Sequence, residues 1–146
     1  MMELTVTFKE MNAGVMLLSA VVISAWVLMG ALGDPGATVP EVASRLGWAI
    51  VASVVFNMVA MIVFTILVSI VQGQELKDER ADERDHAVGA RAMRNAYIVA
   101  SAGGAAAIFL WAFGLDFALG IYVLFGALML AGATDAVSRL YYYRTN

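Results

Sequence analysis

Residues 46–71 read LGWAIVASVVFNMVAMIVFTILVSIV and contain no charged side chain. A helix of about 20 apolar residues is long enough to cross a hydrocarbon core of about 30 Å. This stretch exceeds that minimum, so a helix here would tilt or project past the bilayer. A strand of a membrane barrel would alternate apolar and polar residues, and this stretch does not alternate. It therefore predicts a transmembrane helix.

Three further apolar blocks have the same character. The chain of 146 residues is 62% hydrophobic and only 14% charged, whereas soluble domains carry about 25% charged residues. We predict an all-α fold, a polytopic membrane protein in which residues 1–146 form a single transmembrane domain. It is a four-transmembrane-helix bundle with a charged helical segment, residues 72–95, between the second and third spans. The predicted spans are 13–32, 46–71, 96–115 and 117–137.

Local signals mark the ends of two elements. Thr38-Val39-Pro40-Glu41 has the spacing of a capping box with a proline in the first helical turn. The second helix is therefore predicted to start near Val39, and Gly73 is suited to end it. Gly114-Leu115-Asp116 predicts a tight turn between the last two spans.

The basic residues predict an orientation. Of the nine Lys and Arg residues, all but Arg45 fall in the N-terminal tail, the charged segment or the C-terminal end. With four spans these three regions share one side, and an excess of Lys and Arg is typical of the cytoplasmic side. We therefore expect a multi-pass protein of a prokaryotic inner membrane with both termini cytoplasmic.

The charged segment has an ordered pattern of charge. On a helix at about 100° per residue, acidic side chains recur at the i, i+3, i+4 spacing that marks one face. This pattern predicts a helix over residues 75–91 with opposed faces, although a solvated loop is the simpler alternative. The basic face could contact anionic lipid headgroups or a partner. The acidic face would contain Glu75, Asp78, Glu79, Asp82, Glu83 and His86, and the basic face Lys77, Arg80, Arg84 and Arg91.

Glu83 and His86 also have the Glu-x-x-His spacing that carboxylate-bridged two-metal bundles use. Such a site needs two of these motifs and two further Glu residues, so one copy is a weak signal. A symmetric dimer could supply the second copy. The candidate metal ligands are accordingly Glu79, Glu83 and His86, at a dimer interface.

Few polar residues interrupt the spans. Asn57 lies near the middle of the second span, where its amide needs a partner. An interhelical hydrogen bond is the simpler interpretation, and a substrate or ion path is the alternative. Asp135 is expected to pair with Arg139 at i+4. Small residues at Ala100-x-x-x-Gly104 and Ala127-x-x-x-Ala131 predict close helix packing within the bundle or at a subunit interface.

One motif carries a resemblance to a family. Asp82-Glu83-Arg84-Asp85, followed by Val88, Arg91-Ala92 and Ala96-Tyr97, resembles the D-E-R-D signature of small uncharacterised prokaryotic four-span membrane proteins. In that family the motif lies between the second and third spans, as it does here. The resemblance implies that Asp82, Glu83, Arg84 and Asp85 act as a unit, as a candidate interaction site. Arg84 could cap or clamp helix ends.

The function is only weakly constrained by these features. The absence of cysteine excludes disulfides and thiolate sites, and a single histidine argues against a multi-histidine site. We expect no enzyme activity, no cofactor and no nucleic acid, with membrane lipid and either a second copy or another membrane protein as partners. The leading hypothesis is an oligomeric or accessory subunit whose charged segment contacts a partner or lipid headgroups. A small transporter or channel is the alternative, and the metal site at a dimer interface comes third.

Overall fold

The computed structural model describes residues 7–73 and 82–145, and these form four helices joined by short connections. Each helix is long and apolar enough to cross a membrane. Three helices contain a whole predicted span, and α3 ends at Ala112, three residues before the predicted end of the third span. Within the described residues the predicted all-α fold is confirmed. The helices are α1 (Phe8–Gly33), α2 (Val39–Gln72), α3 (Glu83–Ala112) and α4 (Phe117–Thr145).

The ends of α2 lie where local sequence chemistry predicts them. The Glu41 carboxylate accepts hydrogen bonds from the backbone nitrogen and the hydroxyl of Thr38, at 2.8 and 2.7 Å. This satisfies polar groups that the first helical turn leaves without partners. Gly73 ends the helix in the left-handed region, at φ 62°, which glycine adopts without a steric penalty. The predicted start near Val39 and end at Gly73 are confirmed.

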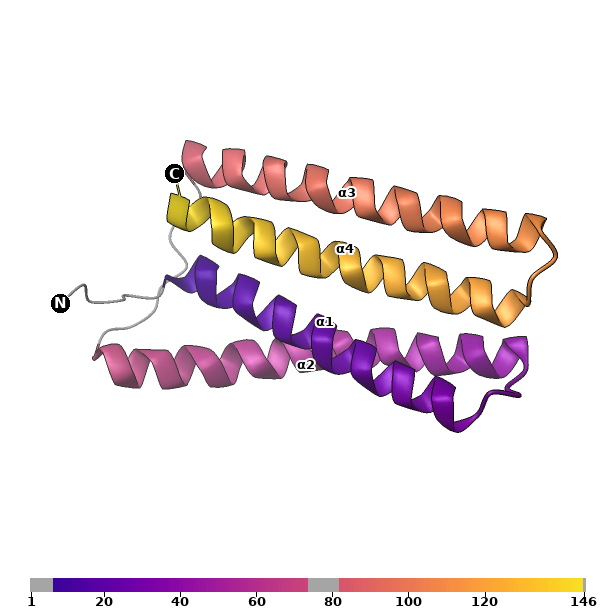
Figure 1. The fold of residues 1–146 in the computed structure, drawn as a ribbon. Coiled ribbons are helices and arrows are strands. Elements are labelled where there is room, and N and C mark those ends of the chain that lie inside the picture. Colours follow the sequence, from indigo (N-terminus) through magenta and orange to yellow (C-terminus); the bar gives the residue numbers. More distant parts are fainter. Residues whose placement is uncertain (1–6, 74–81, 146) are drawn as a thin grey trace.

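The helices form an open stack rather than a closed ring. Figure 1 shows α3 beside α4, α4 beside α1, and α1 crossing α2. Among the described residues α4 packs on all three other helices, whereas α3 has no close backbone contact with α1 or α2. The starts of α1 and α3 and the end of α4 meet at one end of the stack, which we name the charged end (Figure 1).

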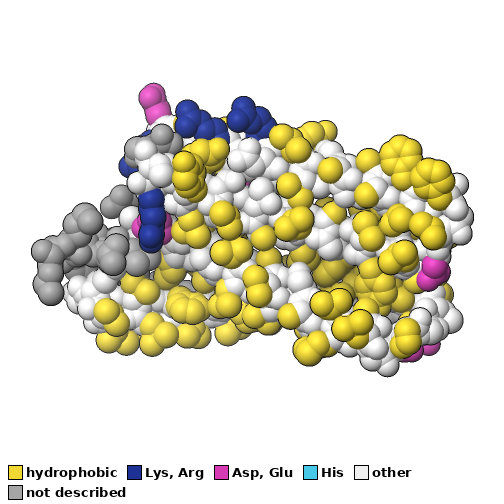
Figure 2. All heavy atoms as spheres, in the orientation of Figure 1, with side chains coloured by type: hydrophobic (Ala, Val, Ile, Leu, Met, Phe, Trp, Pro, Cys, Tyr) yellow, Lys and Arg dark blue, Asp and Glu magenta, His cyan; other side chains and the backbone are white. Residues whose placement is uncertain are grey.

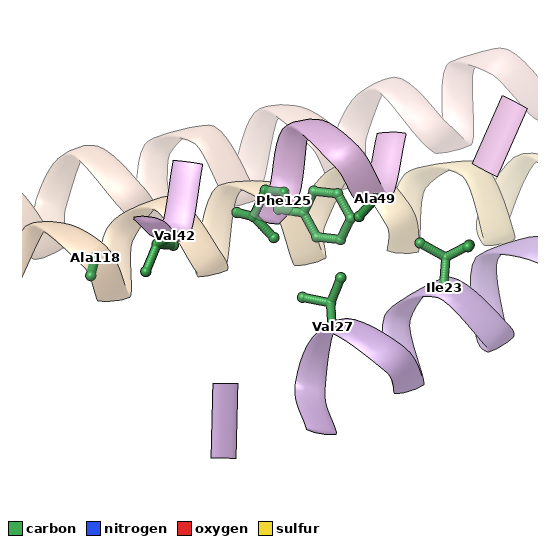
Figure 3. Close-up of a cluster of buried hydrophobic side chains, with 7 residues drawn as sticks. Ile23, Val27, Val42, Ala49, Ala118 and Phe125 are labelled. Carbon is green, nitrogen blue, oxygen red and sulfur yellow. The ribbon is translucent and has the colours of Figure 1, made fainter. Parts of the chain in front are cut away.

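The main apolar cluster lies toward the opposite end of the molecule. It joins the second half of α1 to the first halves of α2 and α4 (Figure 3). Large apolar side chains outside the cluster are exposed along every helix. In Figure 2 they spread over the length of the visible face, as lipid contact requires. The buried cluster contains Ile23, Val27, Val42, Leu46, Ala49, Ala118 and Phe125.

Helices α3 and α4 approach each other closely at Gly103. A Cβ atom on Gly103 would lie 1.9 Å from the Cβ of Ala127, so only glycine fits there. Close packing at Gly104 within the chain is not seen, because a Cβ at Gly104 would meet nothing within 4 Å. Its packing at a subunit interface stays a prediction. Ala131 is buried as packing within the bundle requires. The difference between Gly103 and Gly104 is rotational, since a shift of one residue turns a helical position by about 100°.

Candidate functional site at the charged end

The D-E-R-D motif begins helix α3. Asp82 has an extended backbone, and its Oδ1 accepts a hydrogen bond from the backbone nitrogen of Asp85 at 2.8 Å. The Asp85 carboxylate accepts one in return from the backbone nitrogen of Asp82, at 3.0 Å. This reciprocal cap satisfies two backbone donors of the first turn, where acidic groups also favour the helix dipole.

The cap corrects the prediction of one uninterrupted helix over residues 75–91. A residue with extended φ and ψ angles cannot continue an α-helix, so the helix starts after Asp82. Asp at the cap position outweighs the helical periodicity of the charges, because its side chain competes for backbone hydrogen bonds. The predicted positions Glu75, Lys77, Asp78, Glu79 and Arg80 lie outside the described residues.

Asp85 also joins α3 to α1. Its carboxylate accepts a hydrogen bond from the Lys9 ammonium group, across two helices that have no close backbone contact. This bond with Lys9 is the main cause that lowers the pKa of Asp85 to about 2, and the same bond raises the pKa of Lys9. Asp85 therefore stays ionised at neutral pH. Both residues lie beyond the apolar spans, at the ends of their helices.

Arg84 joins the start of α3 to the end of α4. Its Nη2 donates a hydrogen bond to the backbone oxygen of Tyr143 at 2.9 Å. Carbonyl groups in the last turn of a helix have no intrahelical donor, and a cation there also complements the dipole. The predicted clamping of helix ends by Arg84 is thus seen in the structure. A weaker ion pair, Arg144 to Glu10 at 3.5 Å, ties α4 to α1.

The two candidate metal ligands within the described residues, Glu83 and His86, do not belong to a cluster that could bind a metal ion. Glu83 and His86 are both exposed on the first turn of α3. The part of the chain that the structure describes has no group of three His, Cys, Asp or Glu residues that could hold a metal ion. Glu79 lies outside the described residues, so the metal site stays a prediction.

The charged end encloses a pocket of about 440 Å³, which we name the charged-end pocket. It lies between α1 and α3, and α4 contributes Arg139 and Tyr143. Figure 2 shows Lys and Arg side chains gathered toward this end of the visible face. Sequence reasoning missed the pocket, because its parts come from three distant segments. It is lined by Phe8, Lys9, Asn12, Asp85, His86, Gly89, Ala90, Met93, Arg139 and Tyr143.

Polar contacts between α3 and α4 continue from the pocket toward the spans. Arg139 donates from Nε to Asp135 at 2.8 Å, which confirms the predicted i+4 pair. Asn95 donates to the hydroxyls of Ser138 and Tyr142, at 3.1 and 3.4 Å. The Oδ1 atom of Asp135 is buried and has no hydrogen-bond partner among the described residues.

Asn57 makes the interhelical hydrogen bond that its place in the span predicts. Its Nδ2 donates to the Ser19 hydroxyl of α1 at 2.9 Å and to the backbone oxygen of Ser53 at 2.8 Å. Its Oδ1 is buried without a partner in the described part of the chain. Both Asn57 and Ser19 line a cavity of about 160 Å³ between α1, α2 and α4.

A second polar contact, which sequence reasoning missed, lies at the opposite end. In the sequence, Arg45 bears only on the predicted orientation of the chain in the membrane. Its guanidinium donates to the backbone oxygen of Gly30 at 2.8 Å and to Asp34 at 3.2 Å, and so holds α2 against the end of α1. The available signal is a cation about two helical turns into α2, opposite carbonyls that end α1.

Comparison with known proteins gives no match to a family model, a curated protein or a solved structure. The resemblance of residues 82–97 to the D-E-R-D family therefore stays a prediction. The function of the charged end is therefore inferred from the contacts described above.

Proposed function

We propose that the chain is a non-enzymatic subunit of a homo-oligomer or of a larger inner-membrane complex, with both termini cytoplasmic. On this proposal the charged end contacts lipid headgroups or a partner at the cytoplasmic surface. The observation that supports assembly is the outer face of α3. This helix has more small residues than its contact with α4 requires.

Residues 100–107 of α3 are all small, but they do not all face α4. Gly103 and Ala107 lie toward α4, with Ala107 buried. Four others are exposed on the outer side of the helix: Ser101, Ala102, Ala105 and Ala106. In lipid, helices associate through close packing rather than through hydrophobic transfer, and small side chains permit that approach. An outward face of this kind is therefore suited to a helix of another subunit.

The test replaces one outward alanine with a larger residue. Ala105→Leu should reduce the mass of the detergent-solubilised protein, measured by light scattering, because the larger side chain separates the helices. Ala25→Leu is the matched control, since Ala25 is also an exposed alanine in a membrane-spanning helix. A parent protein that is already monomeric, or an Ala105→Leu variant with unchanged mass, would reject assembly through α3.

A small transporter or channel is the second candidate, and one observation favours it. Two buried oxygens without partners among the described residues, in Asn57 and Asp135, lie on α2 and α4. Asn57 borders the cavity of about 160 Å³ between α1, α2 and α4, large enough for water molecules. Ion flux into liposomes that contain only the purified protein would support this candidate if Asn57→Leu abolished the flux. No flux above that of empty liposomes would reject it.

A further inference from the structure

The charged-end pocket has more hydrogen-bond donors than acceptors. Arg139 uses Nε for Asp135, while Nη1 and Nη2 have no acceptor among the described residues. A Cβ on Gly89 would lie 3.6 Å from Nη1 and 4.0 Å from Nη2, so the guanidinium lies over bare backbone of α3. The ammonium group of Lys9 has three donors and gives one to Asp85. The amide of Asn12 and the ring of His86 also line the pocket, and each can supply a donor and an acceptor.

The described carboxylates in and beside the pocket, Asp85 and Asp135, each pair with a cation, although the Oδ1 atom of Asp135 has no hydrogen-bond partner among the described residues. Asp85 is the single carboxylate among the described lining residues, and it accepts from Lys9 and from the backbone nitrogen of Asp82 in its own helix cap. Asp135 pairs with Arg139 from outside the lining. At Asp85 a cation would therefore have to displace Lys9, whereas an anion could bind donors that have no other acceptor in the described part of the chain. A guanidinium with two free nitrogens is suited to the oxygens of a phosphate group.

The pocket is also open to an apolar environment. Phe8, Ala90 and Met93 supply apolar lining beside the donors. Met93 is 64% exposed, and one turn further into the span Tyr97 is 72% exposed. Because α1 and α3 have no close backbone contact among the described residues, a ligand with a polar head and an apolar tail could enter between them.

We propose that the charged-end pocket binds a phosphate group, and that its ligand is the headgroup of an anionic phospholipid held between α1 and α3. Arg139 and Lys9 contact the phosphate oxygens, and the acyl chains lie along α3 past Met93. The proposal deepens the proposed contact with lipid headgroups and rests on it, but it does not depend on assembly through α3.

The test titrates the detergent-purified protein with phosphatidylglycerol or phosphatidylcholine and counts bound lipid by native mass spectrometry. Arg139→Gln should weaken phosphatidylglycerol binding about tenfold by removing the fork of donors. Gly89→Leu should weaken it similarly by filling the pocket while keeping every charge. Arg139→Lys should restore part of the affinity. Arg94→Gln, an exposed residue of α3 outside the lining, should stay within about twofold of the parent.

A second arm measures thermal stability with inorganic phosphate. Protection of the parent but not of Gly89→Leu would support the same site with free phosphate as its ligand. Equal binding of both lipids, or unchanged binding in Gly89→Leu, would overturn the proposal. Gly89→Leu decides the matter if Arg139→Gln fails to fold around an unpaired Asp135. The same spectra report subunit number, so a parent protein that binds no phosphatidylglycerol but remains oligomeric would reject the site and leave assembly through α3 untouched.

Discussion

The two ends of the molecule are held together in different ways. Toward the end opposite the charged end, α1, α2 and α4 meet through the apolar cluster around Phe125, and Arg45 adds polar contacts. At the charged end, α1, α3 and α4 meet through polar side chains, and a pocket separates α1 from α3. The helices pack closely where apolar side chains fill the space between them, and they stay apart where ion pairs bridge that space.

This difference has a physical basis in the two environments. Within lipid, burial of an apolar side chain gains little by transfer, so contact depends on shape and dispersion. Near the headgroups, long charged side chains can reach across a gap while they remain hydrated. The end that contains the apolar cluster, which we name the filled end, is therefore suited to stability. The charged end, where ion pairs join the helices and which we also call the bridged end, leaves room for a ligand.

The largest effect is expected in the filled end. Phe125→Ala should lower the free energy of unfolding by about 3 kcal/mol, because the cavity that it leaves removes dispersion contacts among three helices. Thermal unfolding in detergent measures the loss. Phe113→Ala is the matched control, since Phe113 is 80% exposed, and its effect should stay within about 0.5 kcal/mol. Equal losses in the two variants would break the comparison.

The seam between α3 and α4 should give the next effect in size. Gly103→Leu should destabilise the protein by about 2 kcal/mol, because its Cβ would overlap Ala127 and force the helices apart. Gly104→Leu should not lower thermal stability, since nothing lies within 4 Å of its Cβ position. If Gly104→Leu is the more damaging variant, the rotation of α3 on α4 is different from the one described.

The features that the sequence predicts correctly are local ones. The spans follow from uncharged runs, the ends of α2 from Thr38 and Gly73, and the Asp135–Arg139 pair from i+4 spacing. Each depends on residues within a few positions of one another. The uninterrupted helix over 75–91 failed for a local reason as well. Asp82-x-x-Asp85 carries a cap signal, and this cap outweighs the helical periodicity of the charges.

The features that it does not predict depend on which helices are neighbours. Lys9 and Asp85 are 76 residues apart, and nothing in the spacing of either links them. The choice between Gly103 and Gly104 at the seam requires the rotation of α3 about its axis. The charged-end pocket exists because α4, rather than α3, packs on α1. Apolar periodicity gives no helix order when lipid-facing and buried surfaces are both apolar.

The smallest expected effect concerns acid and the bridged end. The bond with Lys9 lowers the pKa of Asp85 from an ordinary value near 3.8 to about 2. A depressed pKa means that the contribution of Asp85 is present above pH 3.8 and is lost as the pH falls through about 2. Within this window hydrogen exchange in the first turn of α3 should speed up in the parent. Asp85→Asn should already exchange fast at neutral pH and lack this step, while Glu83→Gln, at an exposed position of the same turn, should keep it. An acid step that persists in Asp85→Asn would assign the titration to another carboxylate and leave the bridge between α1 and α3 without a pH-dependent part.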